Sequence, residues 1–220
     1  METNANTGLG LIKTTIERVQ NEKSLFGSAL KKLVNSSEEE LKDFLDRKIE
    51  KKINGILRLI SEEEVLSLKA SNGSRLIYQS ANTFKSYLDS DFINWGLNKK
   101  GVSIPETNIQ VHEIVADGNF MVIFKSLPGN WNQKWLSQNQ IIDFCEQLPE
   151  WLRADEYATF FLCKIDETKK VDEKNPQKNL VVVCVSVGAD GLRVYVRRLE
   201  DVAVWDAANA HRVVAPQLEA

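Results

Sequence analysis

The side chains with the best spacing for binding a ligand lie near the end of the chain. Residues 179–187 and 192–199 are rich in β-branched residues and flank Gly188-Ala189-Asp190-Gly191, a pattern typical of a β-hairpin. A two-residue and a four-residue loop give the same alternation of faces, because the two registers differ by two residues. One face then holds Val183, Val185, Val187, Val194 and Val196, which we expect to be core. The opposite face holds Cys184, Ser186, Arg193, Tyr195 and Arg197.

Arg193, Tyr195 and Arg197 together suit a single-stranded nucleic acid, because bases stack on tyrosine and arginines neutralise phosphates. The competing interpretation is an ordinary solvated or covered sheet face, since antiparallel sheets alternate apolar and polar sides. The 220 residues include 28 Lys and Arg and 31 Asp and Glu, which gives a formal net charge of −3. We therefore expect the chain as a whole to attract nucleic acid only weakly. This balance argues against a dedicated duplex-DNA binder.

Residues with catalytic or metal-binding chemistry are few and scattered. The two histidines, His112 and His211, have no zinc-ligand spacing, and His112 and Glu113 point to opposite faces of a predicted strand. Asp155 and Glu167 resemble part of a nuclease motif, but a strand of about 35 Å would separate them. The sequence contains no nucleophile elbow, phosphate-binding loop or dinucleotide fingerprint. We therefore expect no catalytic, cofactor or metal residues, and an enzyme of unrecognised type is the third-ranked function.

The cysteines and the apolar runs indicate a compartment. Cys145, Cys163 and Cys184 each lie in an apolar run and form no C-x-x-C pair, so we expect buried free thiols. Residues 1–10 lack a signal-peptide pattern, and the longest apolar run, residues 180–185, is far too short to span a bilayer. We expect a cytoplasmic protein without a membrane partner.

The first 73 residues are predicted to form a helical region. Ser37 and Glu40 form a capping-box pattern, and apolar residues follow at spacings of three and four through Ile60. The residues of this stripe that we assign to interaction are Leu41, Phe44, Ile49, Ile53 and Ile56. Such a stripe is buried either against the rest of the chain or in self-association, and its spacing favours a helical hairpin or bundle over a long coiled coil. Ser71-Asn72-Gly73-Ser74 interrupts the pattern, and we place the domain boundary there.

Two tryptophans in a predicted loop are a further interaction candidate. Trp131 and Trp135 follow Pro128-Gly129. If the two rings are exposed, they form the rim of a site for a ligand or a protein. If they are buried, they pack the loop onto the domain.

Residues 74–220 mix short helices and strands. We expect a short helix from Ser80 to Leu88, strands over 109–115 and 157–165, and a helix capped by Ser137 and Gln140 that ends near Pro149. The predicted fold class is α+β: an N-terminal helical hairpin or bundle over residues 1–73, then a mixed domain around an antiparallel sheet over 74–220, with its β-hairpin near the C-terminus.

Several stretches of the second part resemble one family in their order along the chain. They are YLDSDFINWG at 87–96, VHE at 111–113, LSQNQII at 136–142, WLR at 151–153, YATFFL at 157–162, VWD at 204–206 and RVVAPQL at 212–218. They resemble small hypothetical proteins encoded in the reduced genomes of uncultivated bacteria. The resemblance covers residues 74–218 and implies a cytosolic bacterial protein with a discrete second domain. It implies no activity, substrate or cofactor.

These observations favour a non-enzymatic binding or assembly module whose N-terminal helices mediate self-association or docking to a protein partner. The alternative is a single-stranded nucleic-acid-binding protein that uses Arg193, Tyr195 and Arg197.

Overall fold

The computed structural model describes residues 53–218. The predictions for Leu41, Phe44 and Ile49 lie outside the described residues. The compact unit that contains the sheet begins at Ile53.

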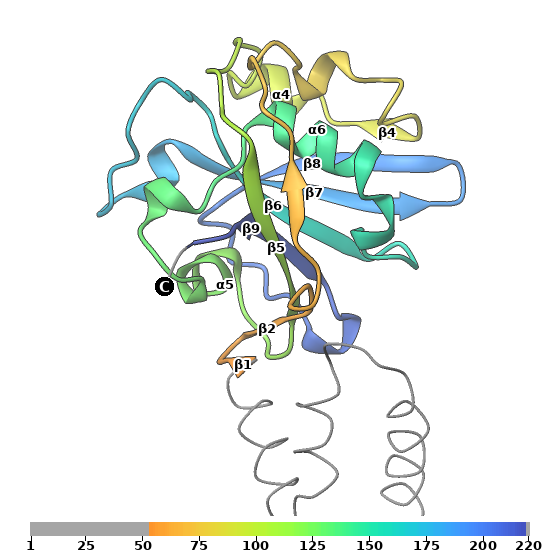
Figure 1. Cartoon of the computed structure of the whole chain (residues 1–220), viewed down its shortest axis with the longest axis vertical. Helices are drawn as coiled ribbons and strands as arrows, with labels where there is room; N and C mark the ends of the chain where they lie inside the picture. The colour runs from red at the N-terminus through yellow and green to blue at the C-terminus, as the bar shows by residue number, and fades with distance from the viewer. Residues whose placement is uncertain (1–52, 219–220) are drawn as a thin grey trace, which may run out of the picture. The chain divides into compact units, whose positions relative to one another are not determined.

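One mixed sheet organises the described part of the chain. Its strands are β1 (Ile53–Asn54), β2 (Leu57–Leu59), β3 (Leu66–Leu68), β4 (Tyr87–Leu88), β5 (Thr107–Ile114), β6 (Ala158–Lys164), β7 (Leu180–Gly188), β8 (Gly191–Arg198) and β9 (Arg212–Pro216). Their order is β1-β2-β5-β9-β6-β7-β8-β4, and β3 pairs with β5 beside β2. The sheet twists strongly, so that β5 stands upright in Figure 1 while β7 and β8 run across the view.

Short helices connect and cover the strands. The α-helices are α4 (Asp91–Asn94), α5 (Phe120–Ser126) and α6 (Gln138–Gln147). The 3-10 helices are η1 (Ile77–Gln79), η2 (Trp131–Gln133), η3 (Pro149–Trp151), η4 (Pro176–Lys178) and η5 (Ala207–Asn209). The α+β class is therefore confirmed for residues 53–218.

The expected antiparallel pairing holds for most neighbouring strands and is wrong at two places. β6 runs parallel to β9, with Phe160 opposite Val213, and β4 runs parallel to β8, with Tyr87 opposite Arg193. Parallel neighbours require a connection that crosses from one end of the sheet to the other. The long segments between β4 and β8 and between β6 and β9 provide these connections.

The predicted hairpin is confirmed, with a two-residue loop at Ala189 and Asp190. Gly188 pairs with Gly191, Val185 with Val194 and Val183 with Val196. The valine face belongs to a core that also contains Leu136, Ile141 and Phe144. Helix α6 lies over this face (Figure 1), and its predicted capping box forms between Ser137 and Gln140.

The other face of the sheet has a second core. It joins residues of β6 and β7, such as Phe160 and Val182, to Phe120 and Phe124 of α5 and to Trp131. All three cysteines are buried free thiols, as predicted. Within residues 53–218, no helix is long and apolar enough to cross a membrane.

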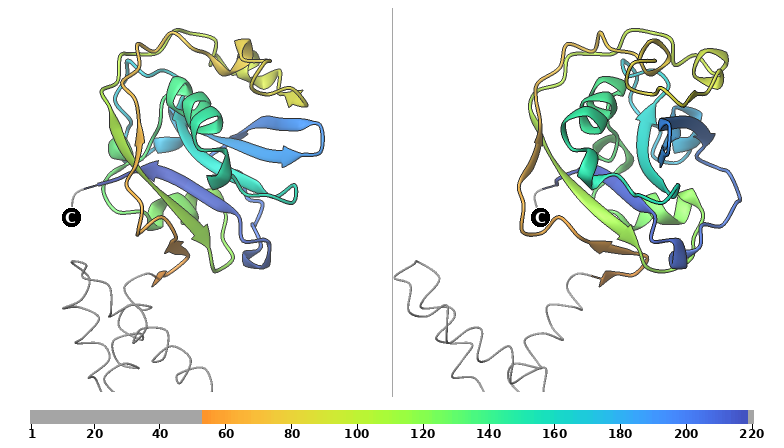
Figure 2. Two further views of the ribbon diagram at one scale, coloured as in Figure 1. Left: turned by 45° about the vertical axis from the view of Figure 1, so that its right-hand side comes forward. Right: turned by 90° about the vertical axis from the view of Figure 1, so that its right-hand side faces the viewer.

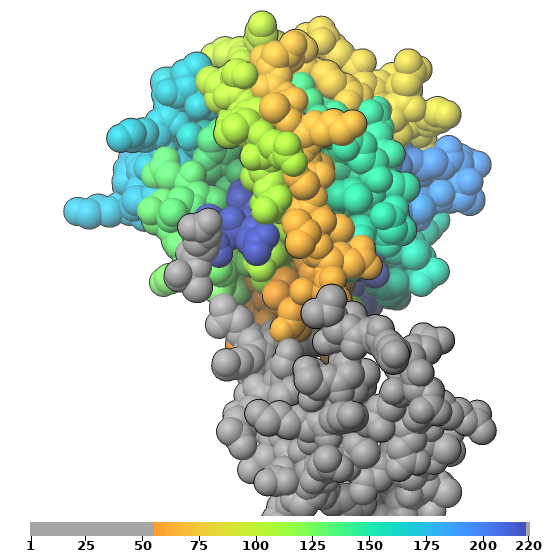
Figure 3. Space-filling view, viewed as in Figure 1, coloured from red at the N-terminus to blue at the C-terminus, as the bar shows by residue number. Residues whose placement is uncertain are grey.

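The helix predicted through Ile60 is wrong from residue 53 onward, and so is the helical interpretation of residues 65–68. Ile53 lies in β1, and Ile56 lies in the turn to β2. β2 and β3 alternate with period two, and both pair with β5 (Figure 3 shows residues 57–70 and 97–110 side by side). The boundary expected at residues 71–74 therefore falls inside the sheet domain. Gly55, at φ +66°, makes the turn that leads out of β1.

The helix predicted from Ser80 to Leu88 is also wrong. The Ser80 carbonyl accepts hydrogen bonds from the backbone N–H groups of Thr83 and Phe84, which is a single turn. The chain then extends into β4, because Ser86 N–H and Asp89 N–H donate to the carbonyls of Leu192 and Val194. Pairing with β8 outcompetes the local helix.

Candidate functional site

The outer strand β8 presents the predicted basic and aromatic side chains on one face. Arg193 lies opposite Ser186, Tyr195 opposite Cys184 and Arg197 opposite Val182. Tyr195 packs at the margin of the second core and is half-buried, whereas Arg197 is exposed. The sheet therefore brings the three predicted residues to the same face.

Strand β4 adds a residue that the sequence pattern did not indicate. Tyr87 lies beside Arg193, and its ring stacks on Tyr195 with centroids 4.8 Å apart and planes at 28°. Tyr87 is 44% exposed. We call Tyr87, Arg193, Tyr195 and Arg197 the tyrosine–arginine surface. These residues belong to β4 and β8, which pair at one edge of the sheet (right-hand side of Figure 1, the side that faces the viewer in the right panel of Figure 2).

Local contacts fix the guanidinium group of Arg193. Its Nε donates to Ser86 Oγ at 3.3 Å, and its Nη2 lies 3.7 Å from Glu156 Oε1. A Cβ at Gly188 would lie 3.1 Å from Arg193 Cζ, so the glycine makes room for the guanidinium. Both side chains of the ion pair are partly exposed, and such pairs contribute little to stability.

Arg197 and its neighbour Arg198 differ from the other arginines of residues 53–218. Neither has a carboxylate or a carbonyl partner in that range, and each lies over an aromatic ring instead. The Arg197 Cζ is 6.0 Å from the centre of the Tyr195 ring, and the Arg198 Cζ is 4.0 Å from that of Trp95. The remaining arginines of this range have such partners: Arg58 with Glu113, Arg75 with Asp143, Arg153 with Asp155, Arg193 with Glu156 and Arg212 with the carbonyls of Glu150 and Leu152.

Acidic side chains also lie near this strand. Burial raises the pKa of the Cys184 thiol far above its ordinary value, the charge of Arg197 opposes that rise, and the charges of Asp201 and Asp89 add to it. The Asp89 carboxylate accepts hydrogen bonds from Asp91 N–H at 3.0 Å and Val196 N–H at 3.3 Å. These N–H dipoles partly offset its charge.

The predicted tryptophan rim is a packed loop. We call residues 129–135 the tryptophan loop. Trp131 is buried, and Trp135 is half-buried with its Nε1 donating to the Asn132 carbonyl at 2.9 Å. The Asn132 amide exchanges hydrogen bonds with the backbone of Val171, and Glu173 accepts from the N–H groups of Trp131 and Asn132. The packing interpretation is confirmed for Trp131, which has no exposed ring to form a rim.

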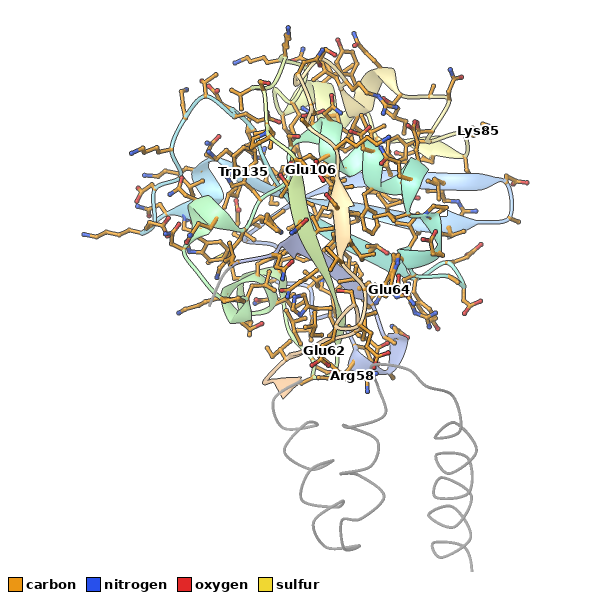
Figure 4. The ribbon with its side chains drawn as sticks, viewed as in Figure 1. Arg58, Glu62, Glu64, Lys85, Glu106 and Trp135 are labelled. Carbon is orange, nitrogen blue, oxygen red and sulfur yellow. The ribbon has the colours of Figure 1, made fainter. Side chains whose placement is uncertain are left out.

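The tryptophan loop and Arg193 lie far apart. Lys164, which lies over the Trp135 ring, is opposite Leu180, whereas Arg193 is opposite Ser186. Six residues of β7 separate these positions, about 20 Å at the rise of a strand. Figure 4 shows Trp135 and Lys85, which precedes β4, on opposite sides of the domain.

Two buried lysines hold the tryptophan loop. Lys134 Nζ donates to the carbonyls of Phe124 and Lys125 at the end of α5, and Lys164 Nζ donates to the Lys169 carbonyl at 2.8 Å. Burial lowers the pKa of both lysines, and nearby acidic groups oppose that shift: Glu173 for Lys134, Glu167 and Asp166 for Lys164. Their donors are directed at backbone carbonyls, which indicates structural roles.

The two histidines are buried in different places. Burial lowers the pKa of His112 to about 4, and it borders a narrow crevice with Gln110 and Lys134 that has no room for a water molecule. His211 Nδ1 accepts from Ala158 N–H at 3.0 Å, with its ring against Phe160 and Trp205. Burial lowers the pKa of His211 as well. The crevice therefore cannot hold a small-molecule ligand, whose pockets usually measure about 300–1,000 Å³.

Ile56 lines an open apolar groove of about 560 Å³. Its other lining residues are Gly55, Met121, Val122, Lys125 and Ser126. That Ile56 takes part in an interaction surface therefore stays a prediction, and the residue lies in a turn rather than in a helix. Within residues 53–218 no group of three or more His, Cys, Asp or Glu side chains is placed to hold a metal ion.

Comparisons with family models, curated proteins and solved structures give no match to this chain. The resemblance of residues 74–218 to a bacterial family stays a prediction.

Proposed function

We propose that residues 53–218 form a binding module that engages single-stranded nucleic acid through the tyrosine–arginine surface. The observation that supports this most is Arg197, which lies over Tyr195 and has no carboxylate or carbonyl partner within residues 53–218. Apart from Arg198, on the opposite face of β8, every other arginine of this range already has such a partner.

The chemistry of the surface fits this ligand class. Bases stack on aromatic rings regardless of sequence, at about 1–3 kcal/mol per base. Tyr87 and Tyr195 offer such rings, and the Arg197 guanidinium extends the stack. Two phosphate contacts, at Arg193 and Arg197, would give a log–log dependence of affinity on salt with a slope of about −1.4. Asp89, Asp201 and Glu156 lower the local positive charge, so we expect micromolar rather than nanomolar affinity.

The test is fluorescence anisotropy of the full chain with a labelled eight-nucleotide oligothymidylate at 50 and 200 mM salt. Tyr195→Ala should weaken binding by about 5- to 150-fold, the equivalent of one base stack. Tyr195→Phe keeps the ring and should bind like the wild type. Tyr87→Ala, at a more exposed position, repeats the test with less effect on folding.

Variants that remove a positive charge test the phosphate contacts separately from the aromatic rings. Arg197→Gln should weaken binding and lower the salt slope by about 0.7, whereas Lys69→Gln should do neither. Lys69 is exposed and follows β3 at the other side of the sheet. No binding by the wild type, or equal binding by Tyr195→Ala and Tyr195→Phe, overturns the proposal.

The second candidate function is assembly. The apolar stripe with Leu41, Phe44 and Ile49 supports self-association or docking of a protein partner. Native mass spectrometry of the full chain tests it: multiples of 24.9 kDa that disappear in Phe44→Glu support assembly. A monomer at every concentration contradicts self-association.

A further inference from the structure

The free edge of β8 is short and is bordered on both faces by aromatic–arginine pairs. β4 covers this edge only at Arg193 and Val194. One step further, the carboxylate of Asp89 accepts from Val196 N–H, so the edge backbone is partly satisfied by a side chain rather than by another strand. After Val194, the edge backbone of β8 therefore has no neighbouring strand among the described residues.

Consecutive side chains of a strand point to opposite faces of the sheet. Arg197 therefore lies on the face of Tyr195, and Arg198 lies on the face that α6 covers. There it meets Trp95, which follows α4 and is half-buried against the first core. The 4.0 Å between the Arg198 Cζ and the centre of the Trp95 ring is the shortest such separation at an arginine in residues 53–218.

Trp95 with Arg198 repeats the chemistry of Tyr195 with Arg197 on the other side of one strand. Arg198 is exposed and, like Arg197, has no carboxylate partner in the described range. A guanidinium plane that rests on an indole can itself stack a base and can also contact a phosphate. The two pairs thus offer equivalent sites to a single strand.

We propose that the bound single strand crosses the free edge of β8, with one base at Tyr87 and Tyr195 and a later base or phosphate at Trp95 and Arg198. This inference rests on the proposed function. Because the two pairs project from opposite faces of β8, a single strand must pass around the edge of the sheet to reach from one pair to the other, which takes more than one nucleotide step of about 3.4 Å. A dinucleotide therefore reaches one pair, and an octanucleotide reaches both.

The carboxylate of Asp89 lies on this path. Its two backbone N–H partners reduce its repulsion of a phosphate, and they hold it in the plane of the sheet edge. The strand must pass this point with a sugar or a base rather than with a phosphate next to the carboxylate.

The test compares labelled oligothymidylates of two and eight nucleotides on the full chain. Arg198→Gln should bind the octanucleotide about three- to fivefold more weakly than the wild type and the dinucleotide equally well, since one cation–aromatic pair is lost. Arg197→Gln should weaken both lengths. Trp95→Phe keeps a smaller ring in the core and should repeat the length-selective loss, and Lys69→Gln is the charge control.

The outcomes separate this inference from the proposed function. If the wild type binds neither length, the proposed function fails and the edge crossing fails with it. If Arg197→Gln weakens binding while Arg198→Gln matches the wild type on both lengths, the proposed function stands and the edge crossing is wrong. An equal loss on both lengths in Arg198→Gln also overturns the crossing, because it indicates general charge attraction.

Discussion

Cations lie over aromatic rings both in the tryptophan loop and on β8, and these two regions differ in what else the cation contacts. In the tryptophan loop, Lys134 lies 5.1 Å from the centre of the Trp131 ring and Lys164 lies 4.2 Å from that of Trp135. Both lysines are buried, and both donate to backbone carbonyls. On β8, Arg197 and Arg198 are exposed and have no such acceptor among the described residues.

The difference teaches how to distinguish a structural cation–aromatic pair from one that is available to a ligand. The ring contact is common to both regions. Buried donors must be satisfied within the protein, because an unsatisfied buried charge is costly. Exposed donors without a protein partner are solvated, and a phosphate can replace that water. The cations of the tryptophan loop therefore have their hydrogen-bond partners within the protein, whereas the arginines of β8 are available to a ligand.

The largest expected effect is a pH dependence of stability beside the tryptophan loop, where His112 shares a crevice with Lys134. The pKa of His112 is about 4 in the folded protein against an ordinary value of 6.5, so the unfolded chain binds the proton first. The free energy of unfolding should be highest above pH 6.5 and fall by about 1.4 kcal/mol per unit between pH 6.5 and 4, on the order of 3 kcal/mol in total. Urea unfolding at several pH values measures this slope.

His112→Gln is the control for that slope. It removes the His112 contribution and leaves the smaller one of His211, whose pKa is also lowered by burial. A slope that is the same in His112→Gln and the wild type would contradict the assignment to His112.

The next effect compares the two kinds of cation directly. Lys134→Met removes the hydrogen bonds to the last carbonyls of α5 and should lower the free energy of unfolding by about 2 kcal/mol. Arg197→Met removes a solvated cation and should change it by less than about 0.5 kcal/mol. The affinity for nucleic acid should change in the opposite order, with a larger loss in Arg197→Met than in Lys134→Met. Equal losses of stability in the two variants would remove the distinction between the regions.

The smallest effect concerns the tyrosine–arginine surface alone. Gly188→Ala places a methyl group 3.1 Å from Arg193 Cζ, so the guanidinium must shift. We expect about a twofold loss of oligonucleotide affinity, with stability within about 0.5 kcal/mol of the wild type. The measurement is anisotropy alongside urea unfolding. Unchanged affinity would place Arg193 outside the contact surface.

Some elements could be predicted from the sequence because a local signal specifies them. The hairpin has Gly188 and Gly191 at its turn, and α6 has Ser137 and Gln140 in reciprocal hydrogen bonds at its start. The faces of β7 and β8 then follow from the period of a strand, which placed Arg193, Tyr195 and Arg197 together.

Other elements depend on contacts that no local pattern contains. Ile53, Leu57 and Ile60 fit a helical stripe of threes and fours, whereas Leu57 with Leu59 and Leu66 with Leu68 fit a strand of period two, so pairing with β5 decided between the two patterns. The Asn54-Gly55 dipeptide was the available hairpin signal. Tyr87 is different, because its place beside Tyr195 depends on a parallel pair between distant segments.

That parallel pair has a kinetic consequence. Ser86 and Arg193 are 107 residues apart, and their contact brings β4 to the last strand of the hairpin. Closing so long a loop costs entropy that is repaid only when the intervening chain is ordered, so such contacts form late in folding. The stacked tyrosines should then be absent from the folding transition state. A ligand held by both rings would slow unfolding and leave the folding rate unchanged.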